Sequence, residues 1–148
     1  MNKLSEHFSW EEAQESEIAA RDGLDNTIPA KHRAAVQRTA AGMEAVRAVL
    51  GDMPIDTVSW YRSAAVNAAA KGSKTSQHCK GEAVDFKCRP FGTPAEICAE
   101  IVKSGIKFDQ LILEFNQWVH ISFSAKPRGQ VLTAVKEHGT TVYKSGLV

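Results

Sequence analysis

The longest regular pattern in the chain is an apolar stripe between Pro29 and Gly51, where apolar residues recur every three or four positions. This period is typical of an α-helix with one buried face, so we predict a helix that begins at Pro29 and ends at Gly51. Capping residues and glycine stops indicate further helices. These cover residues 9–23 and 93–105, an alanine-rich stretch that ends near residue 70, and a short stretch near residues 131–135.

Other stretches are rich in β-branched and aromatic residues, which favour strands. Strands are predicted at residues 55–60, 83–86, 108–115, 118–123 and 140–143, with a hairpin turn around Asn116 and Gln117. Helices come first and strands follow, which is the order of an α+β domain. At 148 residues, the chain has the length of one domain, residues 1–148. We therefore expect N-terminal helices packed on a small antiparallel sheet.

Two polar residues, Asp85 and His120, lie within predicted strands and point away from the core. Alternate side chains of a strand share a face, so Asp85 points away from Val84 and Phe86. By the same alternation, His120 points away from Val119 and Ile121. Imidazole and carboxylate groups are common zinc ligands, and three protein ligands with one open position are typical of catalytic zinc. The sequence therefore predicts that this face carries part of a metal site.

A third ligand is expected in the loop before the strand of Asp85. His78 lies in a loop rich in glycine and serine, and Gly81 follows it at a position suited to a tight turn. Most histidines are solvated or hydrogen-bonded within the fold, and we assign that role to His7, His32 and His138. The predicted metal ligands are then His78, Asp85 and His120, with Zn²⁺ as the cofactor.

Composition excludes several classes of function. The formal net charge is +1, which gives no strong field for binding nucleic acid. No apolar run approaches the length of a membrane span, and the N-terminus lacks the apolar core of a signal peptide. Three cysteines without zinc-finger spacing favour a reducing compartment. We expect a monomer, made in the cytoplasm, that does not insert into membranes.

These residues resemble a known family. The run Ser76 to Asp85 reads Ser-x-His-x-x-Gly-x-Ala-x-Asp, which resembles the zinc signature of the D-Ala-D-Ala carboxypeptidase and L-alanyl-D-glutamate endopeptidase metallopeptidases. The runs 60–63 (Trp-Tyr-Arg-Ser) and 114–120 resemble further family segments. The resemblance implies the fold of the hedgehog signalling domain and a substrate in the stem peptide of bacterial peptidoglycan.

The resemblance also implies roles for other residues. Arg62 is expected to hold a substrate carboxylate or carbonyl oxygen, because its planar fork suits such groups. Ser76 and Trp118 are expected to contact substrate. Glu114 is the expected general base, at the hedgehog-like spacing before the last histidine, whereas other relatives have a glutamate where Gln117 stands. A three-residue turn would place Glu114 on the His120 face, and a two-residue turn would point it away.

Three functions remain open from the sequence. The first is a zinc peptidase that cuts peptidoglycan, such as a phage endolysin. This reading expects that the protein reaches the cell wall through a holin or inside a virion. The second is a binding module that zinc stabilises but that does not catalyse a reaction. The third is an intracellular dipeptidase that hydrolyses free D-Ala-D-Ala. The retained carboxylate of Glu114 favours the peptidase.

Overall fold

The N-terminal segment forms two short helices rather than one. The computed structural model describes residues 2–148, and in it α1 covers Trp10–Gln14 and α2 covers Glu17–Asp22. The prediction of one helix that ends near Gly23 is wrong at its centre. Ser16 is extended, and its hydroxyl accepts a hydrogen bond at 3.1 Å from the amide three residues later. The hydroxyl satisfies a free backbone amide at the N-terminus of α2, which favours the start of a second helix at this point.

The predicted long helix is present but begins later than expected. A 3₁₀ turn, η1, covers Ala30–His32, and α3 covers Arg33–Val49. Pro29 is extended and precedes the 3₁₀ turn instead of opening the α-helix. The predicted apolar stripe is confirmed as buried, at Val36, Ala40, Met43, Val46 and Leu50.

The remaining helices are short and have clear caps. The predicted alanine-rich helix is α4, Ala64–Ala69, and the predicted later helix is α5, Pro94–Ser104. Gly105 ends α5 in the left-handed region, at φ 77°. A 3₁₀ turn that the sequence did not reveal, η2, covers Gln77–Lys80 and carries His78.

Six strands form one sheet in the order β1-β2-β4-β3-β5-β6. Their bounds are β1 Asp56–Ser59, β2 Ala83–Lys87, β3 Gln110–Glu114, β4 Trp118–Ser122, β5 Gln130–Glu137 and β6 Thr140–Ser145. Two expectations need correction. The stretch around residues 131–135 is part of β5 and not a helix, and β5 pairs with β3 in parallel, so the sheet is not wholly antiparallel. The α+β class itself is confirmed.

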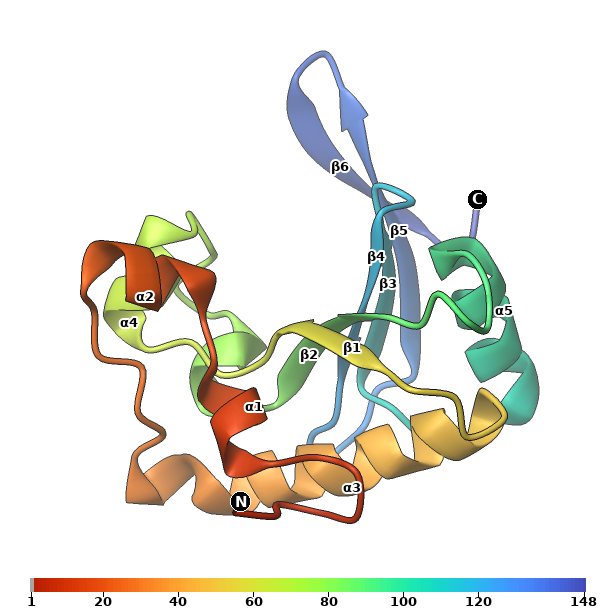
Figure 1. The fold of residues 1–148 in the computed structure, drawn as a ribbon. Helices are drawn as coiled ribbons and strands as arrows, with labels where there is room; N and C mark the ends of the chain where they lie inside the picture. The colour runs from red at the N-terminus through yellow and green to blue at the C-terminus, as the bar shows by residue number, and fades with distance from the viewer. Residues whose placement is uncertain (1) are drawn as a thin grey trace.

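The two faces of the sheet have different surroundings. In Figure 1, α3 and α5 lie beside the sheet, whereas α2 and α4 stand apart from it on the other side. Alternate strand residues such as Val84, Phe86, Val119 and Ile121 form one core with the buried sides of α3 and α5. The opposite face carries Asp85 and His120. Within residues 2–148, the structure contains no helix with the length and apolarity needed to cross a membrane.

Candidate metal centre and active site

Three predicted metal ligands lie together on the face of the sheet that points away from the core. Asp85 on β2 and His120 on β4 are direct partners across the two strands, so their side chains leave the same face. Asp85 Oδ1 lies 2.9 Å from His120 Nδ1, and Asp85 Oδ2 lies 3.3 Å from His78 Nε2. One ligand atom of each residue lies within 4.8 Å of the others. This spacing would allow all three to contact one ion.

Local hydrogen bonds set the orientation of His78. The Ser76 hydroxyl accepts a hydrogen bond from the His78 amide at 3.2 Å, and this contact caps η2. Nδ1 of His78 lies 2.6 Å from the carbonyl oxygen of Trp60. Because a carbonyl only accepts, Nδ1 carries a proton, which leaves Nε2, the nitrogen that faces Asp85, as the atom that would contact a metal ion. A hydrogen bond of this kind commonly orients a metal-binding histidine.

The carboxylate of Asp85 is buried between the two imidazoles. Burial alone would raise the pKa of Asp85, because it disfavours the charged form. The neighbouring His78 and His120 more than offset this effect and hold the pKa of Asp85 well below its usual value. The group is therefore a carboxylate in the neutral pH range, which is the form that binds a metal ion.

Glu114 lies on the same face of the sheet as the three ligands. Strand β3 pairs with β4 so that Glu114 is the direct partner of Trp118, which leaves a three-residue turn at residues 115–117. This register confirms the turn length that the predicted role of Glu114 required. Trp118 and His120 are two positions apart on β4, so Glu114 shares their face.

The surroundings of Glu114 raise its pKa above the ordinary value for a glutamate. Burial raises the pKa of Glu114, and the nearby charge of Asp85 adds to this effect. His120 and Arg62 act in the opposite sense but do not cancel the increase. A carboxyl group whose pKa moves toward neutrality is suited to take up and return a proton.

Arg62 is anchored beside the ligands. Its Nη2 lies 3.4 Å from Asp85 Oδ2, and its Nε donates to the Ser59 hydroxyl at 3.2 Å. Nη1 donates to Asn67 Oδ1 at 3.4 Å. The backbone amide of Arg62 donates to the carbonyl oxygen of His78 at 3.0 Å, which ties the end of β1 to η2. These contacts hold a cationic group beside the predicted metal position.

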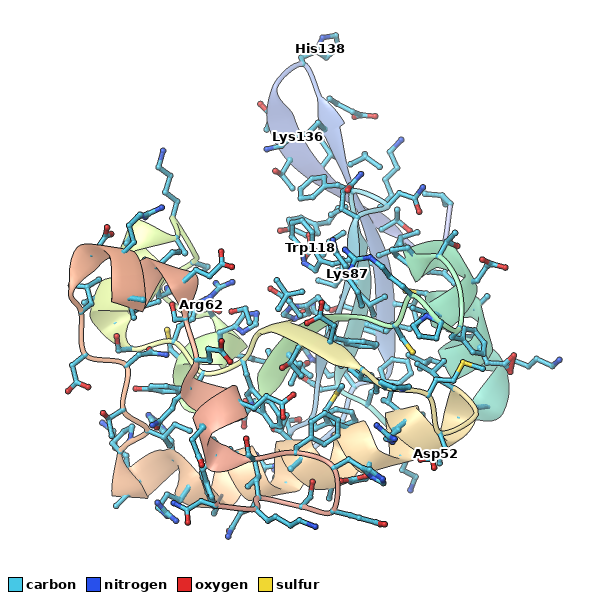
Figure 2. All side chains as sticks on the ribbon, viewed as in Figure 1. Asp52, Arg62, Lys87, Trp118, Lys136 and His138 are labelled. Atoms are coloured by element: carbon cyan, nitrogen blue, oxygen red, sulfur yellow. The ribbon has the colours of Figure 1, made fainter. Side chains whose placement is uncertain are left out.

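A cleft of about 750 Å³ opens onto this arrangement. Arg62, Asp85 and Trp118 line it, and Figure 2 shows Arg62 and Trp118 on opposite sides of the region between the sheet and α4. The side formed by α1, α2 and β1 is acidic, with Glu12, Glu15, Glu17 and Asp56. Trp118 therefore lines the cleft, and its contact with substrate stays a prediction. Ser76 uses its hydroxyl in the η2 cap, and its contact with substrate stays a prediction.

The buried carboxylate of Asp109 holds η2 in place through a hydrogen bond, and the sequence did not predict this contact. Asp109 accepts a hydrogen bond from Gln77, the neighbour of His78, at 2.9 Å. It also accepts bonds from the backbone amide, Nε and Nη2 of Arg128, each at 2.9 Å. Hydrogen bonds from Arg128 lower the pKa of Asp109 to about 2. No local motif could reveal this contact, because the partners are 32 and 19 positions away.

Comparison with known families shows which family this chain belongs to. A model of the family described as peptidase M15 matches residues 6–122, most of the chain. The chain belongs to the peptidase M15 family. The matched region of this M15 peptidase contains His78, Asp85, His120, Arg62 and Glu114. The family consists of zinc metallopeptidases. A comparison with curated proteins gave no match.

The donor set of this M15 peptidase suits zinc, since two imidazole nitrogens and one carboxylate oxygen are among its preferred ligands. Gln117 and Glu82 are the other side chains to consider for the role of Glu114, but neither lies beside the predicted ligands. Gln117 is exposed in the turn between β3 and β4. Glu82 pairs with Arg38 at 2.9 Å, on the other face from Asp85, as alternation predicts. Glu114 is thus the carboxylate that the sheet places beside the predicted ligands.

Proposed function

We propose that this chain is a zinc-dependent peptidase that hydrolyses a peptide bond in the stem peptide or cross-link of peptidoglycan. The observation that carries the proposal is the group of His78, Asp85 and His120, of which Asp85 lines a cleft together with Arg62 and Trp118. Glu114 lies on the same face of the sheet as Asp85 and His120. Membership of the M15 family supports peptide hydrolysis. The three ligands would hold Zn²⁺, which, when bound, would polarise the substrate carbonyl and make water at the site more acidic.

The side chains around this position have complementary tasks. Glu114 removes a proton from the attacking water and then delivers it to the amine that leaves. Its raised pKa suits both transfers, because the protonated form is more accessible than in a free glutamate. Arg62 binds a carbonyl or carboxylate oxygen of the peptide and stabilises the negative charge that develops there. Trp118 provides an apolar wall that orients the peptide.

The retained acid–base and cationic groups favour catalysis over a passive binding module. A module that zinc only stabilises would need the three ligands but would have no need of a half-buried carboxylate on the same face. Glu114 lies on that face, its direct partner is Trp118, and its pKa is raised. We therefore propose that the site turns over its substrate.

The proposal is tested by product analysis with a matched pair of variants. Zinc-loaded protein is incubated with soluble muropeptides that a muramidase releases from peptidoglycan, and mass spectrometry identifies the bond that is cut. Glu114→Gln should keep zinc and the fold but lose about 100- to 10,000-fold in rate. Gln117→Ala, in the adjacent turn, should cost little. Near-normal cleavage by Glu114→Gln would show that Glu114 is not the base.

We propose separately that the chain acts as a phage endolysin. This proposal predicts that added protein lowers the turbidity of a suspension of bacteria whose peptidoglycan is accessible from outside. The Glu114→Gln protein is the control, because it should bind the same walls without lysing the cells. Equal clearing by both proteins would count against lysis by peptide hydrolysis.

A further inference from the structure

One register row of the sheet extends from the proposed active site to the last strand. Glu114 on β3 is paired with Trp118 on β4 and with Ala134 on β5. Ala134 is in turn paired with Tyr143 on β6. Direct partners in neighbouring strands send their side chains to the same face. Tyr143 therefore projects from the face that carries Glu114 and the predicted metal ligands.

The residue between Glu114 and Tyr143 is small. Neighbouring strands lie about 4.8 Å apart, so the backbones of Glu114 and Tyr143 are separated by about 10 Å. Ala134 has only a methyl group to fill this interval, and it is buried. A tyrosine side chain is long enough to span much of this interval. Consistent with that position, partial burial raises the pKa of the Tyr143 phenol, and the charges of Glu114 and Asp85 raise it further.

The Tyr143 ring is available to a ligand. Its exposed fraction is 55%, which is unusually high for a large aromatic side chain on this face. Among residues 2–148, the β6 side chains that form polar contacts are Thr141 and Lys144, and no hydrogen bond holds the Tyr143 hydroxyl. Figure 1 shows the β5–β6 hairpin extending past the ends of β3 and β4 and bending toward the side of α2 and α4.

This hairpin also lies outside the part of the chain that matches the family. The match ends at residue 122, whereas β5 and β6 cover Gln130–Glu137 and Thr140–Ser145. The strands that carry the predicted ligands and Glu114 all precede that limit. The hairpin thus lies outside the matched residues but in the same sheet as Glu114.

We propose that Tyr143 is a substrate-binding residue, whose hydroxyl donates a hydrogen bond to a backbone carbonyl of the bound peptide on the Glu114 side of the cleft. The inference rests on the proposed peptidase function and adds a residue that the family match does not include. The β5–β6 hairpin then extends the substrate-binding surface beyond the cleft that Arg62 and Trp118 line. Because the phenol is protonated throughout the neutral range, it acts as a donor at every working pH.

The test separates binding from turnover. Dissociation constants for the same muropeptides are measured by calorimetry with zinc-loaded Glu114→Gln protein, with and without Tyr143→Phe. Loss of one hydrogen bond between neutral groups should weaken binding about 3- to 10-fold. In the active protein, Tyr143→Phe should raise KM by a similar factor with less effect on kcat. Tyr143→Ala, which also removes the ring, should weaken binding further.

The matched control is Lys144→Ala, because Lys144 is the next residue of β6 and points to the opposite face, where it pairs with Glu137. It should leave binding, KM and zinc content unchanged. The inference is overturned if Tyr143→Phe and Tyr143→Ala both bind and cleave muropeptides like the parent protein. Failure of the proposed function has a different readout, because the zinc-loaded parent protein would then neither bind nor cleave muropeptides. That result would overturn the Tyr143 inference as well.

Discussion

Gly81 links the long helix to the loop that carries His78, and its replacement gives a quantitative test of this packing. Gly81 ends η2 with φ 75°, in the left-handed region. A Cβ at this position would lie 2.4 Å from Cγ2 of Val36 on α3. Val36 is fully buried and β-branched, so its side chain has little freedom to move away. Gly81→Ala therefore combines a backbone penalty with a steric clash.

The two penalties can be separated with a second glycine. The left-handed conformation costs an alanine roughly 1–2 kcal/mol. Overpacking of a filled core adds roughly 1–3 kcal/mol. Gly105 ends α5 with φ 77°, but nothing lies within 4 Å of a Cβ built there. Gly105→Ala should therefore lose only the backbone part, and Gly81→Ala should lose about 2–5 kcal/mol in total.

The assay is equilibrium unfolding in urea, monitored by tryptophan fluorescence for the parent and both variants. Val36→Ala provides a further check, because it removes the Cγ2 atom that a Cβ at position 81 would contact. Gly81→Ala should therefore lower the free energy of unfolding less in the Val36→Ala background than in the parent. Zinc affinity of Gly81→Ala should also fall, since Gly81 closes the turn that carries His78. Equal destabilisation by Gly81→Ala and Gly105→Ala would refute the steric argument.

Two further predictions concern charged groups. The lowered pKa of Asp109 predicts stability that is present above its ordinary pKa of 3.8 and is lost as pH falls toward about 2. Urea unfolding should show the parent about 1–2 kcal/mol more stable than Arg128→Gln at neutral pH, with the difference gone near pH 2; a constant difference would contradict the Asp109–Arg128 contact as its cause. Arg62→Ala should retain zinc but lose on the order of a hundredfold or more in kcat/KM on muropeptides, and Arg62→Lys should recover only part of this loss. An unchanged rate in Arg62→Ala would assign Arg62 to the packing of η2 alone.

Local patterns predicted the strands that carry Asp85 and His120, although not the 3₁₀ turn that carries His78. The signature from Ser76 to Asp85 and the alternation around His120 are properties of short stretches, so they could be read without the fold. The stripe on α3 likewise follows from one helical period. These features were predicted well because each depends on neighbours in sequence.

Features that depend on pairing between distant segments could not be read in this way. The apolar stretch of β5 is short, and short apolar runs do not distinguish a helix from a strand. It becomes a strand because it pairs in parallel with β3, some 20 residues earlier in the chain. The side of the sheet on which Glu114 lies depends on the turn, where Phe115 and Asn116 adopt φ values of 53° and 55°. Residues other than glycine rarely adopt such values, so the sequence did not predict this turn conformation.

The central claim is that His78, Asp85 and His120 hold one zinc ion in a peptidase site, and metal analysis tests it most directly. Parent protein, His120→Ala and His138→Ala are purified in parallel, loaded with zinc and freed of excess metal. Parent and His138→Ala should each contain about one zinc ion per chain, because His138 lies at the tip of the β5–β6 hairpin (Figure 2). His120→Ala should have lost its zinc. A full complement of zinc in His120→Ala, or none in the parent, would contradict the account.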